Sequence, residues 1–153
     1  MTKFLLSLLH QLNRWRYFVT RPITVGVRVL LIREKEVLLV KHTYEPYWYI
    51  PGGGVKKGET ITQAIRREAA EEVGATLEAL RLFGVYTNFY EYKSDHVIVF
   101  VCEEFTVKGQ RSLEIEHFDF FQMDNVPQNI SPGSHRRIIE YSDNVSLPIV
   151  GEW

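Results

Sequence analysis

The chain has 153 residues, of which 45% are hydrophobic and 13% aromatic, and its formal net charge is −1. This composition excludes a disordered chain and predicts a globular domain large enough to bury a core. The nearly balanced charge excludes a generally basic surface, so no DNA partner is expected. The single Cys102 lies in an apolar run and is expected to be a small buried thiol. An unpaired cysteine fits a reducing, cytoplasmic setting.

Residues 1–21 are predicted to form an N-terminal amphipathic helical extension that ends before Pro22. Apolar residues recur there at helical spacing: Leu5, Leu8, Leu9, Leu12 and Trp15. Polar residues interrupt this run, which argues against both a signal peptide and a membrane-spanning helix. Three alternatives stay open for its apolar face: packing on its own domain, packing on a second subunit in a homodimer, or peripheral membrane contact. Residues 22–153 are predicted to form the main domain.

The next two segments are predicted to pair as a hairpin. Residues 23–32 and 36–44 are rich in β-branched residues, and the polar sequence Arg-Glu-Lys-Glu lies between them. A brief strand is expected at 48–50. A glycine-rich loop follows it and leads into the next helix.

A helix is predicted from Ile61 to Val73. Thr60 and Gln63 have the spacing of a capping box, and Gly74 is suited to end the helix as its C-cap. The later elements are two long strands, a short strand and a last helix, expected at 79–92, 96–107, 117–122 and 131–142, with the two long strands joined at 93–95. The order β-β-α-β-β-β-α predicts an α/β fold with a mixed sheet and helices packed on it.

The central helix carries carboxylates on the side that should face the protein. At about 100° per residue, Glu68 and Glu72 share a face with Ile65, and Glu71 flanks that face. Burying unpaired carboxylates is costly, so they need a cation or a shifted pKa. Oxygen ligands at this spacing suit Mg²⁺ or Mn²⁺ better than zinc. The alternative is a solvated charged face with ion pairs to neighbouring arginines.

The glycine loop before this helix strengthens the case for a phosphate ligand. Glycines at 52, 53, 54 and 58 let the backbone approach a ligand closely. Backbone N–H groups near a helix N-terminus also favour phosphate. The glycine loop together with inward-facing carboxylates therefore indicates a phosphate bridged by metal.

Residues 53–75 resemble the signature of the Nudix hydrolases: Gly, five residues, Glu, seven residues, then Arg-Glu-aliphatic-x-Glu-Glu-x-Gly-aliphatic. The matching positions are Gly53, Glu59, Arg67, Glu68, Glu71, Glu72 and Gly74. Ala69 and Ala75 are small for the two aliphatic positions. The resemblance implies a Nudix-like α/β/α sandwich with a mixed sheet.

The resemblance also implies roles for these residues. Glu68, Glu71 and Glu72 would coordinate the divalent cations with help from the Gly52 carbonyl, and Glu59 would pair with Arg67. Family members cleave a nucleoside diphosphate linked to another group by water attack on phosphorus. The expected partner is thus a small nucleoside diphosphate derivative, either similar to ADP-ribose or a nucleotide sugar, or a nucleoside triphosphate. The alternative function is a Nudix-fold module that binds a nucleotide without turnover.

Two further assignments concern the general base and the substrate. Glu114 lies six residues before Phe120, where many relatives carry Trp, so it is the first loop candidate for the base, with Glu116 second. The alternative for both is a solvated residue, and a base on the helix also stays open. Tyr47 and Trp48, just before the glycine loop, are expected to contact substrate together with Gly53 and Gly54. Five aromatic residues could stack on a base or pack in the core instead: Tyr44, Tyr47, Trp48, Phe89 and Tyr90.

Overall fold

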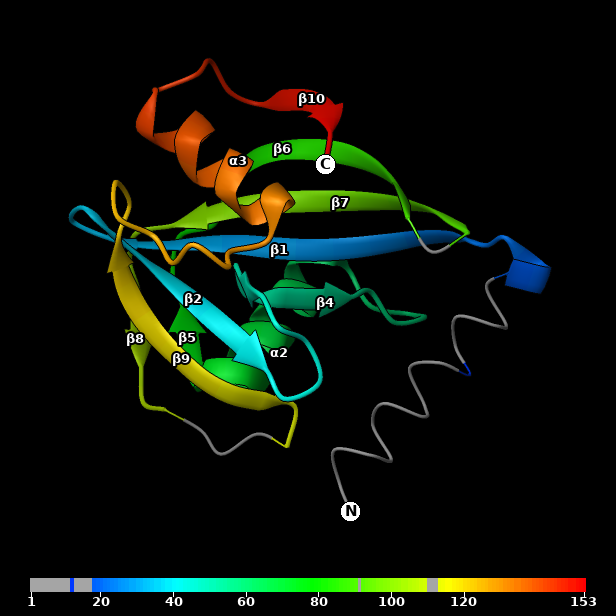
Figure 1. Cartoon of the computed structure of the whole chain (residues 1–153), viewed down its shortest axis with the longest axis horizontal. Coiled ribbons are helices and arrows are strands. Elements are labelled where there is room, and N and C mark those ends of the chain that lie inside the picture. The colour runs from blue at the N-terminus through cyan, green and yellow to red at the C-terminus, as the bar shows by residue number, and fades with distance from the viewer. Residues whose placement is uncertain (1–11, 13–17, 91, 110–112) are drawn as a thin grey trace.

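The structure, a computed structural model, describes residues 12, 18–90, 92–109 and 113–153. A mixed sheet lies between helices α2 and α3, which cover opposite faces (Figure 1). The helices are α2 (Ile61–Val73) and α3 (Pro132–Ser142). The strands are β1 (Ile23–Arg33), β2 (Glu36–His42), β3 (Trp48–Tyr49), β4 (Gly52–Gly54), β5 (Ala75–Leu77), β6 (Arg81–Tyr90), β7 (Lys93–Cys102), β8 (Phe105–Val107), β9 (Ile115–Gln122) and β10 (Ile149–Glu152). The α/β sandwich is therefore confirmed.

Strand β1 is the centre of the eight-stranded sheet, whose order is β10-β6-β7-β1-β2-β3, with β4 on β1 and β9 on β2. The pairs β1–β7 and β10–β6 are parallel. The other pairs are antiparallel, including the β1–β2 hairpin, in which Arg33 pairs with Glu36. The predicted hairpin is thus confirmed. Its first strand, β1, connects β7, β6 and β10 on one side to β2, β3 and β9 on the other.

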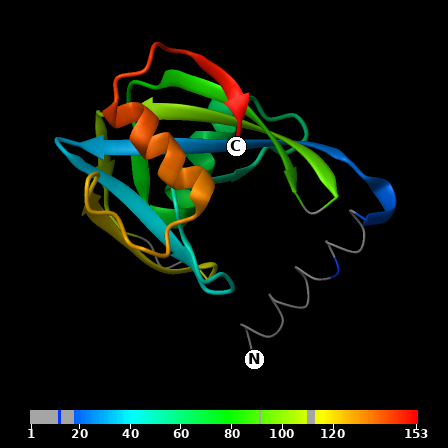
Figure 2. The same cartoon turned by 45° about the horizontal axis from the view of Figure 1, so that its top comes forward.

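The alternation of side chains along β1 divides the core into two layers. Val27, Val29 and Leu31 point to one face and pack in a cluster with buried residues of α2. Leu30 and Ile32 point to the other face, in the cluster that includes Ile138 of α3. This period of two is what an extended strand buried on both faces requires. Figure 2 shows α3 lying across its face of the sheet.

Helix α2 begins and ends as predicted. The Thr60 side chain accepts a hydrogen bond from the Gln63 N–H, and the Gln63 side chain accepts one from the Thr60 N–H. Gly74 has φ 66°, the left-handed conformation that glycine adopts without steric cost. Helix α3 also matches its prediction, with Ser131 as the N-cap and Pro132 in the first turn.

Several predicted boundaries are wrong. The expected strand 96–107 ends at Cys102, and Phe105–Val107 instead pairs with β5 in a separate two-stranded sheet. Residues 93–95 belong to β7 and are not a connection, because Tyr90 already pairs with Lys93. The glycine segment Gly52–Gly54 is a strand on β1. Strands β5 and β10 were not predicted, because each is three or four residues long and depends on a distant partner.

The predicted N-terminal helix lies mostly outside the described residues. Within the described part, residues 18–20 are helical and the chain leaves the helix before Pro22. Phe18 packs edge-on against Tyr92, with ring centroids 5.0 Å apart. No helix among the described residues has the length and apolar character needed to cross a membrane.

Candidate active site

A cavity of about 1040 Å³ lies where β1, β4 and α2 meet the end of β2 and the start of α3. The carboxylates of Glu68, Glu72 and Glu114 line it, although the three residues come from a helix and a distant loop. The glycine strand Gly52–Gly54 forms part of the same wall. The cavity therefore brings together carboxylates and glycines that the sequence placed in separate motifs, whereas Glu59, Arg67 and Glu71 do not line it.

Glu72 is the buried carboxylate of the site, with 6% of its surface exposed. Its Oε2 accepts a hydrogen bond from the Gly52 N–H at 2.9 Å, and its Oε1 lies 3.8 Å from His42 Nε2. Burial raises the pKa of Glu72 to about 8, and nearby Glu68 and Glu114 add to the rise, while Arg28 and the Gly52 hydrogen bond oppose it. A divalent cation would favour the ionised form of this carboxylate.

Glu68 and Glu71 confirm the predicted orientation of the helix. The Glu68 side chain is 15% exposed, whereas the Glu71 side chain is 55% exposed. The Glu68 carboxylate lies directly against Gly53, and a Cβ at residue 53 would come within 2.6 Å of it. A glycine is thus needed at this point for the carboxylate to reach the cavity wall.

Arg67 joins the loop before α2 to the helix. It binds both carboxylate oxygens of Glu59, with Nε–Oε1 at 2.7 Å and Nη2–Oε2 at 3.0 Å. It also donates to Glu68 at 2.6 Å, to Glu71 at 3.2 Å and to the Gly54 carbonyl at 3.0 Å. The hydrogen bonds from Arg67 lower the pKa of Glu59 to about 2, and those from Glu59 raise the pKa of Arg67.

Glu114 reaches the cavity from the segment before β9. Its carbonyl accepts a hydrogen bond from the Thr43 N–H at 2.9 Å, which fixes this segment beside the end of β2. Its charge contributes to the raised pKa values of Glu72 and Tyr44. Glu114 and Glu116 are both exposed, but Glu116, the second candidate base, does not line the cavity.

The donor set around the cavity fits a divalent cation that prefers oxygen. The carboxylates of Glu68 and Glu72 are close enough for their charges to interact, and the absence of a side chain at Gly53 leaves space for the Glu68 carboxylate. Among the described residues no three His, Cys, Asp or Glu side chains already converge on one point. Two of the predicted metal ligands are instead hydrogen-bonded to arginines. Glu71 accepts from Arg67, and the Gly52 carbonyl accepts from Arg28 at 2.9 Å.

The predicted substrate contacts divide into two groups. Gly53 and Gly54 line the cavity, whereas Tyr47 and Trp48 do not. The Trp48 ring packs against Phe121 with centroids 4.9 Å apart, on the face of the sheet that α3 covers. Its neighbour Tyr49 points to the opposite face, as the period of a strand requires, and does line the cavity.

Among the other three aromatic candidates, Tyr44 lines the cavity. Burial, together with nearby carboxylates, raises the pKa of Tyr44 to about 12, so its hydroxyl keeps its proton. Phe89 is 76% exposed and lies outside the cavity lining. The Tyr90 backbone belongs to β6.

Two site residues were missed from the sequence. Arg28 of β1 and His42 of β2 both line the cavity, but each stands in an ordinary strand pattern with no local motif. Burial, with a contribution from Arg28, lowers the pKa of His42 to about 4, so His42 is neutral at pH 7. Its Nδ1 is buried and has no hydrogen-bond partner within the described part of the chain.

The N-terminus of α2, where the sequence suggested a phosphate site, does not border this cavity. The capping box satisfies the N–H groups of Thr60 and Gln63, and neither Thr60 nor Ile61 lines the cavity. The Gly52 N–H points to Glu72 and not to the open cavity. The backbone of this region thus positions a carboxylate.

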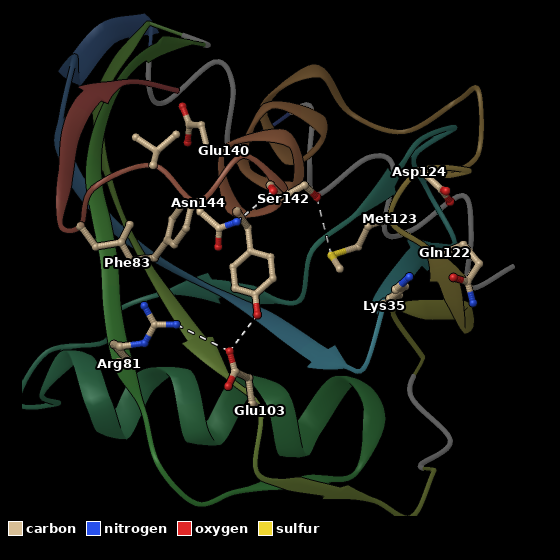
Figure 3. Close-up of a pocket in the computed structure, with 13 residues that line it drawn as sticks. Lys35, Arg81, Phe83, Glu103, Gln122, Met123, Asp124, Glu140, Ser142 and Asn144 are labelled. Atoms are coloured by element: carbon tan, nitrogen blue, oxygen red, sulfur yellow. Dashed lines mark hydrogen bonds and ion pairs between the residues drawn. The ribbon is translucent and has the colours of Figure 1, made fainter.

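A second cavity, of about 720 Å³, lies at the opposite end of α3 (Figure 3). Polar groups on its wall bind one another: the Tyr141 hydroxyl donates to Glu103 at 2.7 Å, and Arg81 lies 3.6 Å from the same carboxylate. Ser142 donates to the sulfur of Met123. This cavity contains none of the residues of the acidic cluster of the first cavity, which are Glu68, Glu72 and Glu114.

We expect alanine at two neighbouring glycines to give different results. A Cβ at Gly52, where φ is 141°, would overlap the Val27 backbone, so Gly52→Ala should destabilise the fold by about 3 kcal/mol or more. A Cβ at Gly53 would meet only the flexible end of Glu68, so Gly53→Ala should lower activity with a stability loss under about 1.5 kcal/mol. Chemical denaturation measures the stability of each variant, and a hydrolysis assay measures its activity. Equal stability losses would contradict this assignment.

Comparison with known proteins gives relatives that share this region. An ADP-ribose pyrophosphatase from Methanocaldococcus jannaschii is 29% identical over 109 residues, which cover 68% of this chain and 64% of that protein. An RNA pyrophosphohydrolase from Erwinia tasmaniensis is 37% identical over 73 residues, covering 48% of this chain and 41% of that protein. The match therefore spans less than two thirds of the length of either relative.

Solved structures share the fold. A MutT Nudix hydrolase from Burkholderia pseudomallei superposes with a TM-score of 0.70 at 24% identity, covering 81% of this chain and 98% of that chain. A MutT protein from Methanosarcina mazei superposes with the same TM-score at 23% identity, covering 82% and 96%. The NUDIX domain family model matches residues 22–141, which is more than half of the chain. The chain therefore belongs to the Nudix family.

Proposed function

We propose that this protein is a divalent-cation-dependent pyrophosphohydrolase that cleaves a nucleoside diphosphate linked to another group. The supporting observation is the meeting of Glu68, Glu72 and Glu114 with the glycine strand in one cavity. In this reaction water attacks one phosphorus, the bridging P–O bond breaks, and the bridging oxygen leaves with the other phosphate. Two phosphate products result.

The chain's own residues would share this work. Glu68, Glu71 and Glu72 would hold Mg²⁺ or Mn²⁺, with Arg67 positioning the first two of these carboxylates. A bound divalent cation neutralises phosphate charge and lowers the pKa of an attacking water. Glu114 would accept the proton of that water, since it lines the same cavity as Glu68 and Glu72.

We infer that the substrate has two parts joined by the diphosphate, as ADP-ribose or a nucleotide sugar does. The cavity, at about 1040 Å³, is slightly larger than the usual range for small-molecule sites, which is roughly 300–1,000 Å³. One relative is named for ADP-ribose and another for RNA, and the names pyrophosphatase and pyrophosphohydrolase describe cleavage of a pyrophosphate bond in those proteins. Nucleoside triphosphates are the second candidate class.

A substrate panel tests the proposal. We would incubate the full chain with ADP-ribose, nucleotide sugars, nucleoside triphosphates and capped RNA, with Mg²⁺, with Mn²⁺ and with EDTA. Hydrolysis that needs the cation and releases two phosphate-bearing products is the expected result. Tight nucleotide binding without hydrolysis of any compound would instead indicate a binding module.

We expect Glu114→Gln to lower kcat by roughly 10²-fold, because glutamine keeps the shape of the side chain but cannot accept a proton. Glu116→Gln is the matched control, since Glu116 lies two residues away and outside the cavity lining. Steady-state kinetics of both variants would measure the effect. An unchanged rate for Glu114→Gln would move the role of base to Glu68 or Glu71.

A further inference from the structure

Arg28 is held tightly in the active-site cavity, yet the mechanism above does not use it. Its Nη1 donates to two carbonyls, that of Ile50 at 3.2 Å and that of Gly52 at 2.9 Å. The guanidinium carbon lies 6.0 Å from the centre of the Tyr49 ring. These contacts fix the direction of the guanidinium beside the glycine strand.

One edge of this guanidinium stays available. Within the described residues, both hydrogen bonds of Arg28 come from Nη1. The Nε and Nη2 atoms make no hydrogen bond of their own there, and neither is a buried atom left without a partner. Both atoms are therefore accessible on a side chain that lines the cavity. The Nε and Nη2 groups are parallel donors at the spacing of two oxygens of a phosphate, which arginine binds in a bidentate manner.

The position of Arg28 relates this edge to the acidic cluster. The Gly52 carbonyl that it binds belongs to the residue whose N–H binds Glu72. Arg28 is also the cation that most opposes the raised pKa of Glu72. A diphosphate with one phosphate at the carboxylates would therefore have its other phosphate within reach of a fixed positive charge.

We propose that the Nε–Nη2 edge of Arg28 binds the second phosphate of the diphosphate, the one that the Glu68–Glu72 cluster does not hold. This inference rests on the proposed function and adds a specificity-determining residue to it. Arg28 makes the site selective for two linked phosphates, because a monophosphate at the carboxylates leaves this edge without a ligand.

A simpler role for Arg28 is to balance the charge of Glu72. The two roles differ in what Arg28→Lys removes. Lysine keeps the positive charge but offers a single ammonium group in place of a planar fork. Charge balance would survive this substitution, whereas bidentate binding of phosphate would not.

The experiment compares binding of ADP and AMP to wild type and Arg28→Lys by calorimetry in Mg²⁺, with Mg²⁺ binding measured separately. We expect ADP binding to weaken at least 10-fold in the variant, AMP binding to change less than about twofold, and Mg²⁺ binding to stay the same. Arg81→Lys, at the second cavity, is the control and should bind ADP as wild type does. Thermal melting checks folding. If the lysine variant unfolds, Arg28→Gln replaces it; because glutamine also removes the charge, an unchanged Mg²⁺ affinity in that variant is what separates lost phosphate binding from lost charge balance.

Unchanged ADP binding in Arg28→Lys, or no ADP binding by wild type, would overturn the inference. A comparable loss of Mg²⁺ affinity would also overturn it, since Arg28 would then act through Glu72. The proposed function fails separately, if wild type hydrolyses nothing in the substrate panel. ADP binding that depends on Arg28 in such a protein would leave the inference standing.

Discussion

Glu72→Gln is expected to lower hydrolysis by roughly 10³-fold and, at the same time, to make the metal-free protein more stable. The loss of activity follows because a neutral amide neither binds a divalent cation strongly nor carries the charge that the site requires. The gain in stability follows because Glu72 is a carboxylate with only 6% of its surface exposed. Glutamine keeps an oxygen that can accept the Gly52 N–H without bringing a charge into the core.

The gain in stability of Glu72→Gln over wild type should increase as the pH rises. The folded metal-free protein has its Glu72 pKa raised to about 8, above the ordinary value of 4.5. Between these values the folded state holds a proton that the unfolded state has lost, so Glu72 makes stability fall as pH rises. The slope approaches about 1.4 kcal/mol per pH unit and ends above the folded pKa. Mg²⁺ affinity should rise over the same range, because binding must release this proton.

Denaturation of wild type and Glu72→Gln in EDTA at pH 5, 6.5 and 8 measures this effect. The stability difference between the two proteins should grow with pH. Glu71→Gln is the matched control on the same helix, since the Glu71 side chain is 55% exposed and should show no such growth. A Glu72→Gln variant less stable than wild type at pH 8 would show that the carboxylate is not strained in the metal-free fold.

Arg67→Lys is expected to lower kcat/KM by about 10- to 100-fold, the range found when groups that orient metal ligands are removed. One ammonium cannot replace the guanidinium, which binds Glu59 at two points while donating to Glu68 and Glu71. The substitution keeps the charge, so the loss would come from geometry. Glu68 would no longer be held at one orientation against Gly53.

Arg66→Lys provides the control for this prediction. Arg66 is the preceding residue of α2, but its guanidinium binds the carbonyls of Leu77 and Glu78, away from the glycine strand. Kinetics of both variants, with Mg²⁺ titrations, would separate the two sites. Equal activity in Arg67→Lys and wild type would remove the bracing role of Arg67.

Helix α2 shows which features of the site the local sequence can predict. Its capping box, its end at Gly74 and its phase are all local, because each depends on residues within four positions along one helix. The burial of Glu72 and the exposure of Glu71 follow from that phase. The inward orientation of Glu68 and Glu72 could thus be predicted before any tertiary structure was known.

The surroundings of the helix could not be predicted in the same way. Strand β5 forms only because β8 pairs with it, and β10 lies at the sheet edge on β6. Trp48 and Tyr49 are equally aromatic neighbours, and only the pairing of β3 with β2 decides that Tyr49 reaches the cavity. These outcomes depend on contacts between residues far apart in the chain.

The sequence by itself determined the acidic helix, the glycines that admit its carboxylates, and the family to which the chain is similar. Only the tertiary structure decided that Arg28, His42 and Glu114 enter the same cavity as the carboxylates of the helix. The physical reason is that a helix sets its own periodicity through short-range hydrogen bonds, whereas a site made between strands and loops depends on long-range pairing and packing.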